Sequence, residues 1–160
     1  MAESPANPIV EPPSGMYPAR LDDKGRLKLP QPFVRYLDLL PEKTLFVTSL
    51  DRTIAQIYPK AVWRQNEAFF EGYRDDPDAA ADIAFNAADL GAETEMDGQG
   101  RVTFSSELRR ALGIENQPVR LFARRGRIEV LSEAVYGERR ERASKDTAAK
   151  VRTLETAGLK

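Results

Sequence analysis

The sequence predicts an α+β fold, mainly of β-strands, built from two copies of a strand–turn–strand–helix unit. Residues 21–37, LDDKGRLKLPQPFVRYL, align with residues 96–112, MDGQGRVTFSSELRRAL, at a constant offset of 75 positions. Each copy is followed by two short apolar runs with the spacing of strands, and helical sequence separates the copies. With 160 residues, the chain has room for one compact domain or for two small half-domains that share a core.

Both copies contain an Asp-x-x-Gly-Arg motif between two alternating runs. The matching residues are Asp22, Gly25 and Arg26 in the first copy and Asp97, Gly100 and Arg101 in the second. The aspartate can accept hydrogen bonds from turn amides, and the glycine can adopt a positive φ without steric cost. The motif therefore predicts a tight hairpin, with the arginine at the start of the outgoing strand.

A helix is expected directly after each motif. Prolines at positions 30 and 32 favour a helix start in the first copy, because their φ is already helical. Ser105 and Ser106 occupy the matching region of the second copy, where a serine side chain can cap the helix. Each unit thus runs strand, turn, strand and helix.

Two further hairpins are predicted, one after each helix. The first joins residues 44–49 to 53–58 through Leu50-Asp51-Arg52, and the second joins 119–123 to 127–131 through Arg124-Arg125-Gly126. The similarity of these regions indicates that the repeat includes the hairpin as well as the motif.

The sequence between the copies predicts two helices, separated by Asp75-Asp76-Pro77. Gly91 is expected to end the second helix. Apolar residues that share one face are Val62, Phe69 and Tyr73 in the first helix, with Trp63 and Phe70 beside them, and Ile83, Ala87 and Leu90 in the second.

Composition then suggests where the folded part begins and ends. Proline is frequent and apolar residues are rare at the amino terminus, whereas charged and small residues dominate the carboxyl terminus. The expected segments are a disordered arm (1–16), a first repeat (17–63), a helical linker (64–92), a second repeat (93–137) and a charged helix that frays into a tail (138–160).

The residue types that are missing restrict the chemistry. The chain has no cysteine and no histidine, so it lacks the usual zinc ligands and the most common nucleophile and proton-transfer pairs. A magnesium site on Asp22, Asp23 and Asp97 is chemically possible, but turn capping explains Asp22 and Asp97 more simply. We therefore expect a protein that is not an enzyme and that has no cofactor, no metal and no small-molecule substrate.

The sequence shows neither a secretory signal nor an apolar stretch long enough to span a bilayer. We expect a cytoplasmic protein with no membrane partner.

Charge is distributed unevenly along the chain. The net charge is −1, yet residues 17–63 contain eight basic and five acidic residues, and residues 96–130 contain seven and four. Residues 64–95 contain only two basic and nine acidic residues. A basic face can therefore exist on a chain of nearly neutral total charge.

The pattern Leu-Asp-x-Lys-Gly-Arg-Leu-x-Leu-Pro, repeated as Met-Asp-Gly-x-Gly-Arg-Val, resembles the MraZ family, whose two halves are AbrB-like (SpoVT-AbrB) domains. The resemblance covers residues 16–136. It implies a swapped-hairpin, double-psi-like barrel made by both halves, assembled as a homo-oligomeric ring. It also implies a bacterial, nucleoid-associated regulator that represses its own division and cell-wall gene cluster by binding double-stranded DNA at tandem promoter repeats.

The resemblance implies specific DNA contacts. It places the family's DNA-contacting arginine on Arg26, the neighbouring lysine on Lys24 and the second arginine on Arg101. Further basic candidates for the same surface are Lys28, Arg35 and Arg109.

The chain departs from the family pattern in both copies. Val34 stands where the family usually has an arginine, and Arg35 follows it. Gln99 and Ser105 replace the lysine and the proline in the second copy, so we expect a weaker contact from that half.

Alternative interpretations of the same residues remain open. Arg26 and Arg101 can be surface arginines that pair with Asp23 and Asp97. The segment 124–127 is a second basic candidate, although a solvated hairpin tip accounts for it. An oligomeric interaction module that docks a protein partner on the acidic helices, with little DNA binding, is the alternative function.

Overall fold

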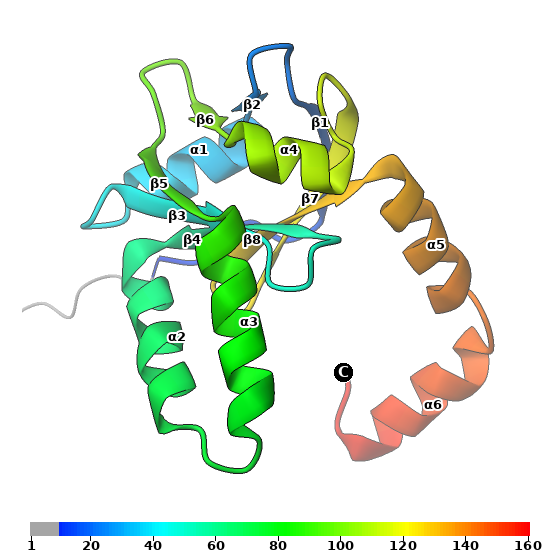
Figure 1. Cartoon of the computed structure of the whole chain (residues 1–160). Helices are drawn as coiled ribbons and strands as arrows, with labels where there is room; N and C mark the ends of the chain where they lie inside the picture. Colours follow the sequence, from blue (N-terminus) through cyan, green and yellow to red (C-terminus); the bar gives the residue numbers. More distant parts are fainter. Residues whose placement is uncertain (1–9) are drawn as a thin grey trace, which may run out of the picture.

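The computed structural model describes residues 10–160, and the predicted α+β class is confirmed. The elements of this part of the chain, drawn in Figure 1, are β1 (Met16–Arg20), β2 (Arg26–Lys28), α1 (Gln31–Asp38), β3 (Thr44–Thr48), β4 (Ala55–Pro59), α2 (Lys60–Gly72), α3 (Pro77–Leu90), β5 (Ala92–Glu95), β6 (Arg101–Thr103), α4 (Ser106–Leu112), β7 (Pro118–Arg124), β8 (Arg127–Ser132), α5 (Glu133–Ala143) and α6 (Thr147–Ala157).

The strands form two antiparallel sheets that mix the two halves. The larger sheet has the order β1-β7-β8-β4-β3-β5, and β2 pairs with β6 in a separate two-stranded sheet. The first strand of each half lies beside the third strand of the other half, because β1 pairs with β7 and β5 pairs with β3. The two halves therefore complete one another's sheet.

This pairing corrects one expectation. The runs on either side of the first Asp-x-x-Gly-Arg turn were expected to pair with each other, but only a single bridge, Leu21 with Leu27, joins them. Beyond that bridge β1 and β2 separate into different sheets. Leu21 and Leu27 are both fully buried in a core that contains residues of both halves, and the separation of the strands lets both side chains reach it.

The two later hairpins are confirmed. β3 pairs with β4, and β7 pairs with β8 in a register that places Arg124 opposite Arg127. Arg125 and Gly126 form the two-residue turn between them with φ values of 52° and 78°, which is the geometry of a tight hairpin turn. β4 also pairs with β8, so the hairpins of the two halves meet in the middle of the sheet.

The core repeats the sequence repeat. Positions 27, 29 and 33 of the first half and the equivalent 102, 104 and 108 of the second half are all buried in one cluster. Both helix starts are as expected: Pro30 precedes α1, and the Ser105 hydroxyl accepts a hydrogen bond from the Leu108 N–H at the start of α4. The offset of 75 therefore relates matching positions in space as well as in sequence.

The helices α2 and α3 form an antiparallel pair that lies on the opposite side of the sheet from β2 and β6 (Figure 1). Trp63 of α2 is buried against Phe46 and Tyr58, with ring centroids 4.6 and 5.0 Å away. Phe69, which the helical periodicity placed on the inward face, is mostly exposed, so the packed face of α2 is that of Trp63 and Phe70.

The break between these helices is as predicted. Asp76 caps α3 by accepting a hydrogen bond from the Ala79 N–H, and Pro77 is its first residue. α3 ends at Leu90, and Gly91 has an ordinary φ of −91°. Glycine is needed there because an added Cβ would lie 2.2 Å from the Phe46 ring.

The ends of the chain differ from expectation. Within the predicted disordered arm (1–16), residues 1–9 lie outside the described residues, Val10 packs against the core and β1 begins at Met16. At the other end, two helices replace the single fraying helix expected in 138–160, and α5 begins earlier, at Glu133, where Ser132 caps it.

None of the helices within residues 10–160 has both the length and the apolar character needed to cross a membrane.

A matched pair of phenylalanine substitutions tests the shared core. Phe104 has 0% of its surface exposed and Phe85 has 66%. We expect Phe104→Ala to lower the free energy of unfolding by about 3–5 kcal/mol, because it leaves a cavity between the halves. Phe85→Ala should change it by less than about 0.5 kcal/mol. Chemical denaturation monitored by circular dichroism measures both, and equal effects would contradict this packing.

Candidate nucleic-acid interface

The two Asp-x-x-Gly-Arg turns have the same hydrogen bonds. In the first, one carboxylate oxygen of Asp22 accepts from the N–H groups of Lys24 and Arg26, both at 2.9 Å. The Gly25 N–H donates to the Asp22 carbonyl, and Gly25 has a φ of 78°. The second turn repeats every one of these bonds, with Asp97 as acceptor and Gly100 at a φ of 75°. In both turns the aspartate accepts from turn amides and the glycine has a positive φ.

The aspartate of each turn also forms a salt bridge with the arginine of the same turn. The second carboxylate oxygen of Asp22 accepts from Nε of Arg26 at 2.9 Å, and that of Asp97 accepts from Nε of Arg101 at 2.8 Å. The partner of Arg26 is thus Asp22, and not Asp23 as in the alternative interpretation of a surface pair. Within residues 10–160, the Nη groups of both arginines have no hydrogen bond, and the side chains are 32% and 26% exposed. Both guanidinium groups are thus fixed at Nε, with their Nη groups left available.

Reciprocal backbone hydrogen bonds connect the two turns. The Gly25 carbonyl accepts from the Phe104 N–H at 2.8 Å, and the Gly100 carbonyl accepts from the Leu29 N–H at 2.9 Å. Between them β2 and β6 pair, with Arg26 opposite Thr103 and Lys28 opposite Arg101. Each turn is therefore braced by the strand that leaves the other turn.

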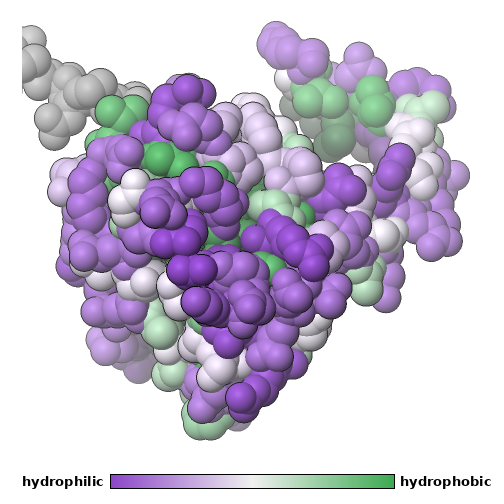
Figure 2. All heavy atoms as spheres, turned by 90° about the horizontal axis from the view of Figure 1, so that it is seen from above, coloured by the Kyte–Doolittle hydropathy of each residue, from purple (hydrophilic) through white to green (hydrophobic). Residues whose placement is uncertain are grey.

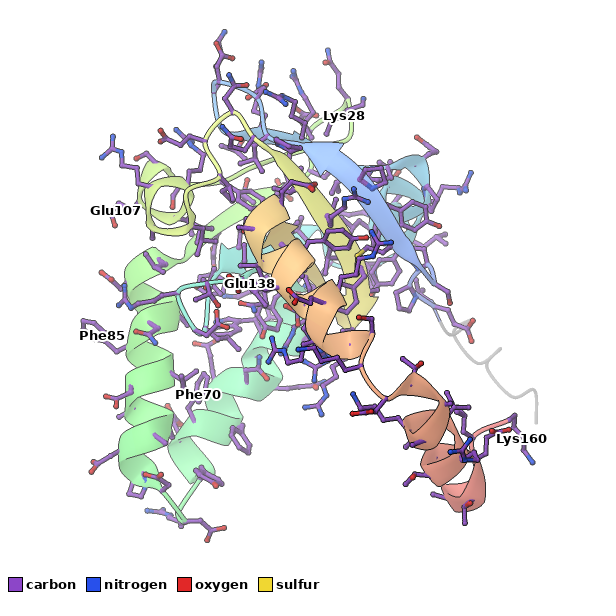
Figure 3. All side chains as sticks on the ribbon, turned by 90° about the vertical axis from the view of Figure 1, so that its right-hand side faces the viewer. Lys28, Phe70, Phe85, Glu107, Glu138 and Lys160 are labelled. Atoms are coloured by element: carbon purple, nitrogen blue, oxygen red, sulfur yellow. The ribbon has the colours of Figure 1, made fainter. Side chains whose placement is uncertain are left out.

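The β2–β6 pair has one apolar and one basic face. Leu27 and Val102 are fully buried, and since side chains alternate along a strand, Arg26, Lys28 and Arg101 lie on the other face. The Lys28 ammonium also donates to the Gln99 carbonyl of the second turn. This end of the molecule, at the top of Figures 1 and 3, is mostly hydrophilic when viewed from above in Figure 2. Together with Lys24 in the first turn, these residues form a surface that we call the turn face.

The remaining predicted contacts lie elsewhere. Arg35 is exposed in the last turn of α1, outside the β2–β6 pair. Arg109 of α4 is only 16% exposed, and its Nη1 donates to the Phe104 carbonyl at 2.7 Å. It also lies directly against Gly25, where an added Cβ would be 1.8 Å from Nη1. Arg109 therefore lies largely buried against the first turn, whereas Arg35 lies on α1, outside the β2–β6 pair.

Val34 and Arg109 are equivalent positions of the repeat, because they are 75 residues apart. Arg109 lies against Gly25, and Val34 lies against Gly100, where an added Cβ would be 2.9 Å from a Val34 methyl. Each of these helix residues thus lies against the turn of the other half. Sequence reasoning treated Val34 as the loss of a contact and did not identify this packing, although the offset of 75 relates the two positions.

The second basic candidate, segment 124–127, is partly occupied by internal contacts. Arg127 donates to Glu129 at 2.8 Å and to the Tyr58 hydroxyl at 2.9 Å. Glu129 is buried, and Arg124 lies 3.7 Å from it. Arg127 therefore neutralises a buried carboxylate in the middle of the larger sheet.

The turn bonds favour ionised aspartates. They lower the pKa of Asp22 from its ordinary 3.8 to about 2, and the hydrogen bond from the Arg26 N–H is the largest cause. The pKa of Asp97 is lowered too, chiefly by the Arg101 N–H. No group of three or more acidic side chains positioned to hold a metal ion occurs in residues 10–160. The carboxylates of Asp22 and Asp97 instead serve the turns.

Alanine substitutions at two glycines test the first turn. Gly25→Ala should lower the free energy of unfolding by about 1–2 kcal/mol, because φ is 78° and the methyl would displace Arg109. Gly98→Ala is the control, since a Cβ there meets nothing within 4 Å, and it should change the free energy by less than about 0.5 kcal/mol. Thermal and chemical denaturation measure both, and a harmless Gly25→Ala would show that the turn is relaxed.

The lowered pKa of Asp22 predicts a titration. Because the folded pKa lies below the unfolded pKa, the stabilisation from Asp22 is complete above about pH 4 and is lost as the pH falls through about 2. Carboxyl chemical shifts in an NMR titration should give a midpoint near 2 for Asp22. Arg26→Ala should raise this midpoint only partly, because the backbone donors remain. A midpoint near 3.8 in the native protein would contradict the turn geometry.

Known proteins provide an independent comparison. No family model matches the chain. It is 36% identical over 104 residues to the transcriptional regulator MraZ of Koribacter versatilis. The aligned region covers 64% of this chain and 71% of that relative. The chain is 32% identical over 127 residues to MraZ of Acidobacterium capsulatum (79% and 86%), and 33% identical over 106 residues to that of Corynebacterium kroppenstedtii (66% and 71%). The chain therefore belongs to the MraZ family of transcriptional regulators.

Proposed function

We propose that this regulator binds double-stranded DNA with the turn face, through Arg26, Lys28 and Arg101 on the β2–β6 pair and Lys24 in the first turn. The supporting observation is that two separate segments of the sequence place Arg26, Lys28 and Arg101 on one side of a two-stranded ladder. Arginine and lysine are the side chains that bind phosphates and guanine edges. The repeats 17–63 and 93–137 would each provide one turn.

The hydrogen bond from Nε of each arginine to its turn aspartate favours DNA recognition. The aspartate fixes the guanidinium at Nε, so little side-chain entropy is lost when the Nη groups bind a ligand. A bidentate contact uses two parallel N–H groups of the guanidinium, and the Nη groups can provide them. A two-stranded ribbon also fits the width of the major groove. We propose that the two turns enter the groove together.

Most of the acidic segment 64–95 lies away from this face. It forms α2 and α3, which lie on the opposite side of the sheet from the turns (Figure 1). Of the acidic residues in the turns themselves, Asp22 and Asp97 are paired with Arg26 and Arg101. This arrangement explains how a chain with a net charge of −1 can bind DNA.

Several copies acting together would supply the affinity that a single face lacks. We propose a homo-oligomeric ring that engages tandem repeats upstream of its own gene, because each later contact is intramolecular. Repression of the division and cell-wall gene cluster would follow from occupying that promoter. Gln99 replaces the lysine of the first turn, so the second half would contribute less. Arg109 would act by supporting the first turn, and Arg35 would flank the face.

Binding to DNA from upstream of its own gene tests the proposal. Arg26→Ala should weaken binding by about 1–3 kcal/mol, which is roughly 5- to 150-fold. If Arg26 contacts a phosphate, the slope of log affinity against log salt should also fall by about 1. Fluorescence anisotropy across a salt series measures both quantities. A scrambled duplex of the same length shows whether binding depends on the repeats.

Arg64→Ala is the matched control, because Arg64 is an exposed arginine on α2 that pairs with Glu42, far from the turns. It should change the affinity less than about twofold. If the native protein is a folded oligomer that binds neither duplex, DNA binding by this chain is refuted. The alternative function, docking of a protein partner on the acidic helices, would then take its place.

A further inference from the structure

The carboxyl-terminal helices form an arm that stands off the body. α5 packs against β7 and β8, whereas α6 makes no extensive contact with another element of residues 10–160. Figures 1 and 3 both show α6 separated from the body and from α2 and α3 of its own chain. Three residues join the helices, including Asp146 with a φ of 52°, a conformation that aspartate tolerates better than most residues. α6 is therefore connected to the body only through α5 and the three residues that follow it.

The arm carries an apolar surface that nothing in residues 10–160 covers. Val151 and Leu154 are three residues apart on α6, so they share one face, and both are about half exposed. Leu159 just beyond the helix is also about half exposed. Figure 2 shows apolar residues on this part of the arm, at the upper right. At 100° per residue Lys150 lies beside Leu154 at one edge of this apolar stripe, and Glu155, followed by Arg152, lies at the other edge.

A groove of complementary character lies between α2 and α3. It has a volume of about 390 Å³ and is lined by apolar and acidic side chains. Trp63 in its lining is buried, Phe70 and Ala84 are partly buried, and Glu67 and Glu71 are exposed. The one basic lining residue, Lys60, is paired with Glu93 at 2.6 Å. The groove therefore presents apolar surface bordered by negative charge.

The overall charges match as well. Residues 138–160 contain seven basic and four acidic residues, whereas residues 64–95 contain two and nine. Opposite charge of this size favours association and selects the orientation of the partners. In this conformation α6 is separated from α2 and α3 of its own chain and does not occupy their groove (Figures 1 and 3).

We propose that the α2–α3 groove binds α6 of a second copy of this chain, so that neighbouring copies are connected by an exchanged carboxyl-terminal arm. Val151 and Leu154 would cover Trp63 and Phe70, while Lys150, at the edge of the stripe next to Leu154, would face the acidic lining. This inference goes beyond the proposed function, because the contact requires no DNA and assigns the acidic helices a role in assembly.

Disulfide trapping tests the exchange, since the chain has no cysteine. Thr147→Cys places a thiol on the α6 face of Val151 and Leu154, and Ala88→Cys places one in the groove. Thr156→Cys is the matched control: it is nine residues, or two and a half turns, from Thr147, so it points the opposite way. Each α6 variant, carrying a size tag, is mixed with untagged Ala88→Cys and oxidised mildly without DNA.

The expected result is a disulfide-linked pair of one tagged and one untagged chain, at least tenfold more abundant with Thr147→Cys than with Thr156→Cys. Adding Val151→Asp and Leu154→Asp to Thr147→Cys should abolish it, with circular dichroism confirming that the protein is folded. The proposal is overturned if the yields of the two variants are equal or if no linked pair forms.

A double variant, Thr147→Cys with Ala88→Cys, tests whether α6 of the same chain occupies the groove. Closure within single chains at high dilution, without linked pairs, would mean that the arm folds back onto its own groove and would also overturn the proposal. Because these readouts use no DNA, their failure leaves the DNA-binding result unaffected. Loss of DNA binding likewise leaves the trapping result unaffected.

Discussion

The structure depends on the reciprocal pairing of the two turns. Each glycine carbonyl accepts a hydrogen bond from the strand that leaves the opposite turn, and β2 pairs with β6 between them. Neither half can form this arrangement alone, because each lacks the donor and the strand that the other supplies. The exchange of β1 and β5 between the halves and the shared core have the same consequence. The chain is therefore one cooperative unit in which two copies of a motif are held at a fixed separation.

Much of this could be predicted from the sequence, and the remainder has a common physical origin. The offset of 75 identified the turns, helix starts and later hairpins, because local bonding and helix capping are encoded by neighbouring residues. Periodicity shows which face of a strand is buried but does not identify its partner, so the exchange of strands between halves was missed. For the same reason the sequence does not show that Arg109, a candidate DNA contact, lies against Gly25 of the other half. Helical periodicity also does not distinguish Phe69 from its neighbour Phe70. Phe70 is the one that packs, because it lies against the buried cluster around Trp63.

The separation of charge relates the fold to its proposed role. The sheet divides the molecule, with the basic turn face on one side and the acidic helices on the other. The two turns differ in charge, because Lys24 of the first turn is replaced by Gln99 in the second. Both turns keep the arginine that is hydrogen-bonded to an aspartate. Two copies of one structural motif thus present related but unequal surfaces. If the proposed exchange of the carboxyl-terminal arm holds, the basic arm and the acidic groove would connect copies without using the turn face.

Native-state hydrogen exchange of the Leu29 and Phe104 amides tests most directly whether the two halves brace each other. Both amides donate to the glycine of the opposite turn. If the turns form one unit, both should exchange only through global unfolding, with the same free energy as the central amides of β4 and β8. Exchange of either amide through a local opening of much lower free energy would show that the halves hold their turns independently, and it would contradict this description of the fold.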